Sequence, residues 1–116
     1  TKASLYLISG DGDLITGEDG LELDSIFKEE KVTKVVGKTD GQNGLWLVWN
    51  PPYPKVTHIN SAGSIDSPQW DVKGRKITDI KGSVIEYNSL SIFSDGSLII
   101  PYKKDGYFLQ KVGIHD

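Results

Sequence analysis

The chain has 116 residues, a net charge of −3, and hydrophobic and charged fractions of 37% and 25%. This length suits one domain, so we expect residues 1–116 to form a single unit with its own core. The composition excludes a disordered chain, and the lack of cysteine excludes disulfides and thiolate metal sites. A cysteine-free chain also favours the cytoplasm, or a virion, over an oxidising compartment.

The charge pattern argues against nucleic acid as a partner. Only one of the 13 cationic side chains is an arginine, Arg75, and the basic stretch around it is interleaved with Asp71 and Asp79. Nucleic-acid surfaces carry a net basic, arginine-rich patch. No apolar run approaches the ~18 residues of a membrane-spanning helix, so we expect no membrane span either.

Short apolar runs separated by glycine and proline predict a mostly β fold, an antiparallel β-sandwich or barrel. Five of the Asx–Gly pairs in the sequence predict tight hairpin turns, because Asn, Asp and Gly tolerate a positive φ. These pairs are residues 11–12, 19–20, 43–44, 95–96 and 105–106. The predicted strands are residues 4–9, 13–16, 32–36, 45–49, 55–59, 69–73, 76–80, 83–87, 90–93, 97–101 and 107–112.

Two features of the pattern leave alternatives open. In residues 21–31 the apolar positions fit helical spacing and also, in part, alternation, so we expect at most one short helix near 22–30. Residues 4–15 resemble residues 89–99, each a short run followed by an Asp–Gly pair. The same turn chemistry arising twice explains this more simply than a pseudo-symmetric fold, because no third copy occurs.

A cluster of aromatic residues surrounds the segment 45–54. On a strand, Trp46 and Trp49 point to opposite faces, so if one face is core the other presents a ring to solvent. An exposed ring would suit a sugar or a protein partner. The alternative is that all the tryptophans are core and the prolines only end the strand. The candidate binding residues are Trp46, Trp49, Asn50, Tyr53, Asp66 and Trp70.

Catalytic and metal-binding motifs are missing from the sequence. No glycine-rich phosphate loop or Gly-x-Ser-x-Gly elbow occurs, and the two histidines are His58 and His115. The acidic residues between 11 and 24 do not match a calcium-binding loop, so we interpret them as solvated turns. We therefore expect no enzymatic activity, no cofactor and no metal, with His58 as the residue to test if activity is found.

These observations favour a non-catalytic protein-interaction or assembly domain. Such a domain would bind a protein partner or self-associate, as does a structural subunit of a larger particle such as a virion or phage tail. The stiff segment 50–54 and the strand edges that a small β protein must cover motivate this hypothesis. The alternative is a carbohydrate-binding (lectin-like) module that uses exposed Trp and Tyr rings.

Overall fold

Short antiparallel strands make up nearly all of the regular structure. The computed structural model describes residues 4–5, 21–22, 32, 34–50, 53–65, 70 and 73–115. Its elements are β1 (Ser4–Leu5), β2 (Leu21–Glu22), β3 (Lys34–Thr39), β4 (Leu45–Asn50), β5 (Lys55–Ile59), β6 (Arg75–Lys76), β7 (Val84–Ile85), the 3-10 helix η1 (Tyr87–Ser89), β8 (Ser91–Ile92), β9 (Leu98–Lys103) and β10 (Tyr107–Val112).

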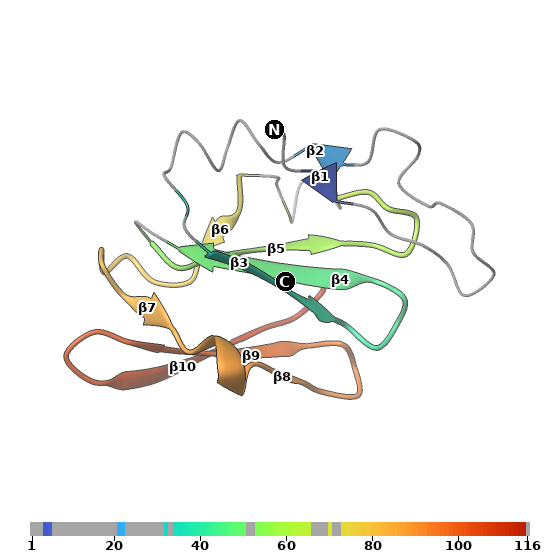
Figure 1. The fold of residues 1–116 in the computed structure, drawn as a ribbon. Coiled ribbons are helices and arrows are strands. Elements are labelled where there is room, and N and C mark those ends of the chain that lie inside the picture. Colours follow the sequence, from blue (N-terminus) through green and yellow to red (C-terminus); the bar gives the residue numbers. More distant parts are fainter. Residues whose placement is uncertain are drawn as a thin grey trace.

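The strands form two antiparallel four-stranded sheets that face each other (Figure 1). One has the order β3-β4-β5-β6, and the other has the order β10-β9-β7 with β8 also paired to β9. A separate two-stranded ladder joins β1 to β2, which Figure 1 shows on the far side of β5 from the second sheet. The predicted mostly β, antiparallel fold is confirmed, and two facing sheets are compatible with a sandwich.

Alternation along the central strands creates the core between the sheets. Trp46 and Val48 of β4 face the second sheet, whose β9 contributes Leu98 and Ile100, and all four side chains are buried. The opposite face of β4 is buried as well: Leu47 and its neighbours pack in a second, smaller cluster. Because both of its faces are covered, β4 reads as a continuous apolar run rather than an alternating one.

Three of the predicted hairpin turns are confirmed. Asn43 and Asp105 have φ values of 68° and 58°, and Gly96 has a φ of 88°, so each turn uses the left-handed backbone that its Asx–Gly pair allows. These turns join β3 to β4, β8 to β9 and β9 to β10. The pairs at 11–12 and 19–20, and most of the first copy of the resemblance between residues 4–15 and 89–99, lie outside the described residues.

Several predicted elements differ from the structure. Residues 77–80 are not a strand, because the Thr78 hydroxyl accepts a hydrogen bond from the Ile80 N–H at 3.3 Å and bends the chain. The predicted strand 83–87 is shortened by η1 to Val84–Ile85. Leu21 and Glu22 form a strand, and the rest of the helix predicted near 22–30 lies outside the described residues.

A proline lies inside β9, which has neighbours on both sides. The Pro101 carbonyl oxygen accepts a hydrogen bond from the Glu86 N–H at 2.8 Å, just beyond the end of β7. In an antiparallel strand the N–H and C=O of one residue point to the same side, so the nitrogen of Pro101 also faces away from β10. The ladder between β9 and β10 therefore loses no hydrogen bond to the proline.

Candidate functional site

The three tryptophans predicted as binding residues lie in the interior. Trp46, Trp49 and Trp70 are 0%, 1% and 2% exposed. Trp46 and Trp70 meet edge to face with 5.1 Å between ring centroids, while Trp49 lies on the opposite face of β4. Of the two alternatives for the aromatic cluster, the structure therefore shows the one in which the tryptophans are core, and no ring of β4 faces solvent. None of these three rings can stack on a sugar while the chain keeps this conformation.

The other predicted binding residues have structural contacts or lie outside the description. The side-chain oxygen of Asn50 accepts a hydrogen bond from the Tyr87 hydroxyl, which links β4 to η1. Tyr53 is half-buried, and the Lys76 Nζ lies 3.9 Å from its ring centroid. Pro54 is fully buried and its carbonyl accepts the Ile77 N–H, so this end of the proline-rich segment is held against the chain. Asp66 lies outside the described residues.

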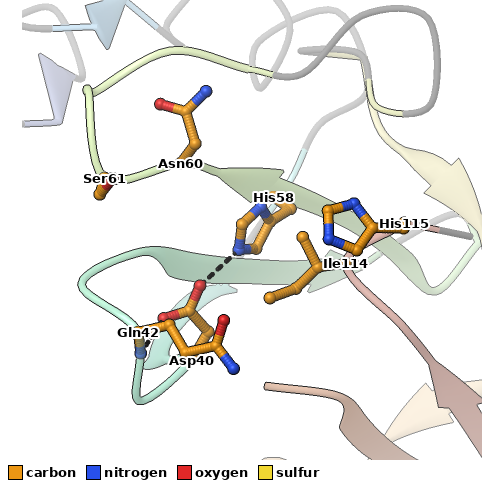
Figure 2. A pocket seen from close by; sticks show the side chains of 7 residues that line it. All are labelled: Asp40, Gln42, His58, Asn60, Ser61, Ile114 and His115. Atoms are coloured by element: carbon orange, nitrogen blue, oxygen red, sulfur yellow. Dashed lines mark hydrogen bonds and ion pairs between the residues drawn. The ribbon is translucent and has the colours of Figure 1, made fainter. Parts of the chain in front are cut away.

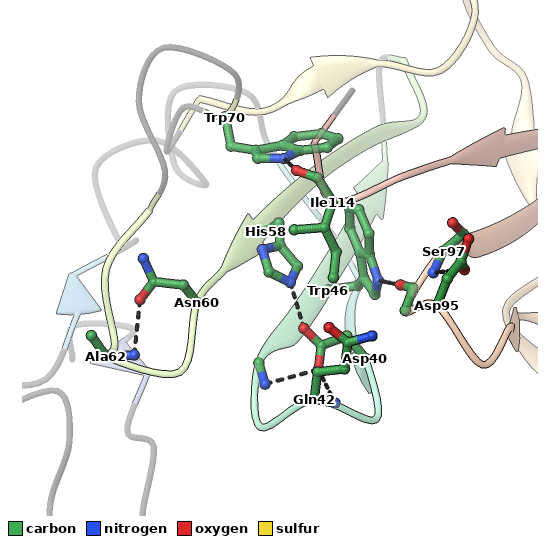
Figure 3. Close-up of polar contacts among 12 residues, drawn as sticks. Asp40, Gln42, Trp46, His58, Asn60, Ala62, Trp70, Asp95, Ser97 and Ile114 are labelled. Carbon is green, nitrogen blue, oxygen red and sulfur yellow. Dashed lines mark hydrogen bonds and ion pairs between the residues drawn. The ribbon is translucent and has the colours of Figure 1, made fainter.

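A buried carboxylate–imidazole pair joins the turn after β3 to β5. The His58 Nε2 and the Asp40 Oδ2 are 2.7 Å apart, and both side chains are 2% exposed (Figure 3). Asp40 follows the last residue of β3, and His58 lies opposite Trp46 in the β4–β5 ladder. The register of three strands thus brings together two residues that are 18 positions apart.

The turn itself holds the Asp40 carboxylate in place. Its Oδ1 accepts hydrogen bonds from the Gln42 N–H at 2.7 Å and the Gly44 N–H at 2.8 Å. Burial raises the pKa of Asp40, but the bonds from His58 and from the two backbone N–H groups outweigh it and hold this pKa below its usual value. Gly44 is needed here, because a Cβ at this position would lie 2.3 Å from the Asp40 Oδ2.

His58 also lines a small polar hollow. Because the ionised Asp40 can only accept, the Nε2 of His58 donates, and the Nδ1 is left buried without a hydrogen-bond partner in the described structure. Figure 2 shows this nitrogen on the side of the ring nearer Asn60. The hollow has a volume of about 180 Å³ and is lined by Asp40, Gln42, His58, Asn60, Ser61, Ile114 and His115.

The chemistry available in this hollow is limited. A carboxylate that orients an imidazole is a general-base or metal-ligand arrangement, with the free Nδ1 as the reactive atom. The Ser61 hydroxyl lines the hollow but makes no bond to that nitrogen. Within the described ranges, no group of three or more His, Cys, Asp or Glu side chains could hold a metal ion. The pair has the geometry of a structural link between the β3–β4 turn and β5.

The outer face of the second sheet exposes several large apolar side chains beside Lys103 and Lys111. Tyr107 and Leu109 of β10 are 80% and 72% exposed, and the register places them beside Lys103 and Pro101 of β9. Val84 of β7 and Phe93 after β8 add further exposed apolar area. All of these side chains point away from the core because their strand neighbours Ile85, Ile92, Leu98, Ile100 and Tyr102 point into it.

β10 is also an open edge of its sheet. In the described part of the chain it pairs with β9 alone. Ser97 and Pro101 accept hydrogen bonds from Phe93 and Glu86, so every second residue of β9 directs its backbone groups away from β10. The residues opposite these positions make non-hydrogen-bonded pairs and direct their own N–H and C=O groups to the open edge. They are Tyr107, Leu109 and Lys111.

Sequence reasoning missed both the exposed face of β10 and the Asp40–His58 pair. Three consecutive apolar residues, Tyr107, Phe108 and Leu109, directly follow a hairpin turn. Because strand side chains alternate, such a run places apolar groups on both faces, and on a strand covered on one face only it exposes at least one of them. Nothing local in the sequence pairs Asp40 with His58, since only the register of β3, β4 and β5 brings them together.

Among the elements that the structure describes, no helix has the length and apolarity needed to cross a membrane. Comparison with known proteins finds no match to a family model, a curated protein or a solved structure.

Proposed function

We propose that this chain is a non-catalytic protein-interaction domain that assembles through the outer face and open edge of β10. The observation that carries the proposal is the exposure of Tyr107 and Leu109, 80% and 72%, on a strand with an unpaired side in the described structure. We call Tyr107, Leu109, Val84 and Phe93, with the backbone edge of β10, the β10 surface.

Two physical arguments support an interaction at the β10 surface. Soluble proteins rarely expose contiguous large apolar side chains unless they are covered by a partner or a ligand. Edge strands that must stay unpaired are protected by lysine, proline or bulges. β10 carries one lysine, Lys111, and neither proline nor an acidic residue, so little opposes the addition of another strand.

The same surface suits the larger assemblies that the sequence suggested. A structural subunit of a particle such as a virion or phage tail would bury this face against its neighbours. The carbohydrate-binding alternative is less well supported, because its three tryptophans are buried. A sugar would have to use the half-buried Tyr53 or the exposed Tyr107 instead.

The solution mass of the protein tests the proposal. Light scattering behind a sizing column, over a wide concentration range, would compare the wild type with the double variant Tyr107→Ser/Leu109→Ser. We expect the wild type to associate with itself or with a defined partner, and the double variant to remain monomeric. Both side chains point to solvent, so the double variant should keep its fold and its circular dichroism spectrum.

A matched control uses the other sheet. Val35 lies on β3, an edge strand of the first sheet in the described structure, and is 37% exposed. Val35→Ser should leave the association unchanged. A wild type that stays monomeric at high concentration and binds no protein that the double variant fails to bind would overturn the proposal.

A further inference from the structure

We propose that β10 pairs with the β10 of a second copy of this chain, antiparallel about a two-fold axis through Leu109. This inference rests on the proposed function and names its partner and its register. The pairing would join the second sheets of two copies into one continuous sheet. β10 ends the strand order of the second sheet, and Figure 1 shows it on the side of the molecule away from β1 and β2.

The backbone of β10 is self-complementary. Its edge N–H and C=O groups belong to Tyr107, Leu109 and Lys111, which are spaced evenly about Leu109. A two-fold axis at Leu109 places Leu109 opposite its own copy and Tyr107 opposite Lys111 of the other chain. Each of these pairs can then exchange two backbone hydrogen bonds, as in the close pairs of any antiparallel ladder. No edge group of the three residues is left over.

Two other registers, with the axis at Lys111 or at Tyr107, use the edge less well. An axis at Lys111 would place two lysines directly opposite each other, and like charges in that position are destabilising. An axis at Tyr107 would place Leu109 opposite Asp105, which has a φ of 58° and belongs to the turn rather than to a strand. The axis at Leu109 avoids both faults and pairs all three residues.

The side chains agree with this register. Tyr107, Leu109 and Lys111 share the outer face, so the two Leu109 side chains would meet at the axis. The Lys111 Nζ already lies 4.7 Å from the ring centroid of Phe93 and would gain the Tyr107 ring of the other copy as a second aromatic neighbour. The Lys111 carbonyl already accepts a hydrogen bond from the Gln110 side-chain amide at 3.1 Å, and its second lone pair would accept the Tyr107 N–H of the other copy.

Single cysteines test the register, because the chain contains no other thiol. Opposed residues in a close antiparallel pair have Cα atoms about 5.5 Å apart, within the range that a disulfide spans. Under mild oxidation Leu109→Cys should therefore give a disulfide-linked dimer. Tyr107→Cys and Lys111→Cys should each stay monomeric on a non-reducing gel, because like positions would be roughly 14 Å apart along the strand. An equal mixture of these two variants should give the mixed dimer.

The outcomes separate this inference from the proposed function. Because a strand pair buries little area, we expect a weak dimer, so oxidation should be run at the concentration where light scattering detects association. Leu109→Lys would place two lysines opposite each other at the axis. It should reduce the dimer fraction at that concentration at least tenfold.

A wild type that associates through the β10 surface, but whose Leu109→Cys variant is not cross-linked faster than the Tyr107→Cys variant, would overturn the register and leave the proposed function standing. Association only with a different protein would overturn the self-pairing in the same way. A monomer with no partner would overturn both.

Discussion

The indole N–H of Trp46 donates a hydrogen bond to the carbonyl oxygen of Gly96 at 2.8 Å, and so ties β4 of the first sheet to the β8–β9 turn of the second (Figure 3). Both groups are buried. Trp46→Phe should lower the free energy of unfolding by about 2–3 kcal/mol, because it leaves a cavity and an unpaired carbonyl.

Urea denaturation followed by circular dichroism would measure this loss. Tyr53→Phe is the control, since it removes only a hydroxyl from a half-buried ring and should change the free energy of unfolding by about 0.5 kcal/mol or less. Equal effects of the two substitutions would contradict the role assigned to the Trp46 bond.

The sequence predicted correctly those strands whose residue pattern and flanking turn residues indicate a strand without help from distant contacts. Lys55–Ile59 and Tyr107–Val112 have the predicted bounds, and three Asx–Gly turns join strands as expected. The strand predicted over residues 76–80 was wrong beyond Lys76, because the Thr78 hydroxyl accepts the Ile80 N–H in place of a neighbouring strand. The continuous apolar run of β4 fits a strand buried on both faces, but the run alone does not say which parts of the chain cover each face.

The Asp40–His58 pair should show strong energetic coupling. Removing either partner takes away the bond between the Asp40 Oδ2 and the His58 Nε2 and leaves the remaining buried atom without it. Asp40→Ala and His58→Ala should therefore each destabilise the protein, and the double variant should lose less than their sum. We expect a coupling energy of about 1–3 kcal/mol from a double-mutant cycle in urea. The exposed pair Lys103–Glu86, 3.2 Å apart, is the matched control and should show little coupling.

The lowered pKa of Asp40 also predicts a pH dependence. A carboxyl group whose pKa is lower in the folded state stabilises the protein above its unfolded value of 3.8, and this contribution is lost as the pH falls below it. The wild type should therefore lose stability in acid more steeply than Asp40→Asn, which has no such group to protonate. If the unfolding temperatures of the two proteins fall equally steeply as the pH is lowered, the assignment to Asp40 is contradicted.

The raised pKa of Tyr87 predicts a loss of stability at alkaline pH. Burial raises the pKa of its hydroxyl to about 12. Because the unfolded chain ionises near pH 10, the stabilising effect of the neutral hydroxyl is present below pH 10 and is lost as the pH rises toward 12. Tyr87→Phe should flatten the alkaline decline in unfolding temperature. A decline of unchanged slope in this variant would assign it to other groups.

The burial of the tryptophans predicts their fluorescence. Iodide should quench the emission of the native protein weakly, because Trp46, Trp49 and Trp70 are at most 2% exposed, and strongly after unfolding in urea. A sugar that stacked on one of these rings would shift the native emission. Because the rings are buried, a panel of glycans should leave the emission unchanged. Strong native quenching, or a sugar-dependent shift, would restore the carbohydrate-binding alternative.

The direction of the backbone groups in β10 predicts an asymmetry between two neighbouring prolines. The Leu109 N–H points to the open edge, whereas the Gln110 N–H points into the ladder with β9, opposite Ile100. Leu109→Pro should therefore cost the isolated chain little, because edge positions tolerate proline. Gln110→Pro removes a ladder hydrogen bond and pushes the strands apart, and should cost at least about 2 kcal/mol.

Urea unfolding of both variants, at a concentration where the wild type is monomeric, measures this difference. The same Leu109→Pro variant should lose self-association, because its missing N–H is one that a second copy would bind. A Leu109→Pro variant as unstable as Gln110→Pro would mean that the Leu109 N–H already serves the ladder. The edge of β10 would then present the groups of Phe108 and Gln110 instead, and a two-fold pairing centred on Leu109 would have no donors to use.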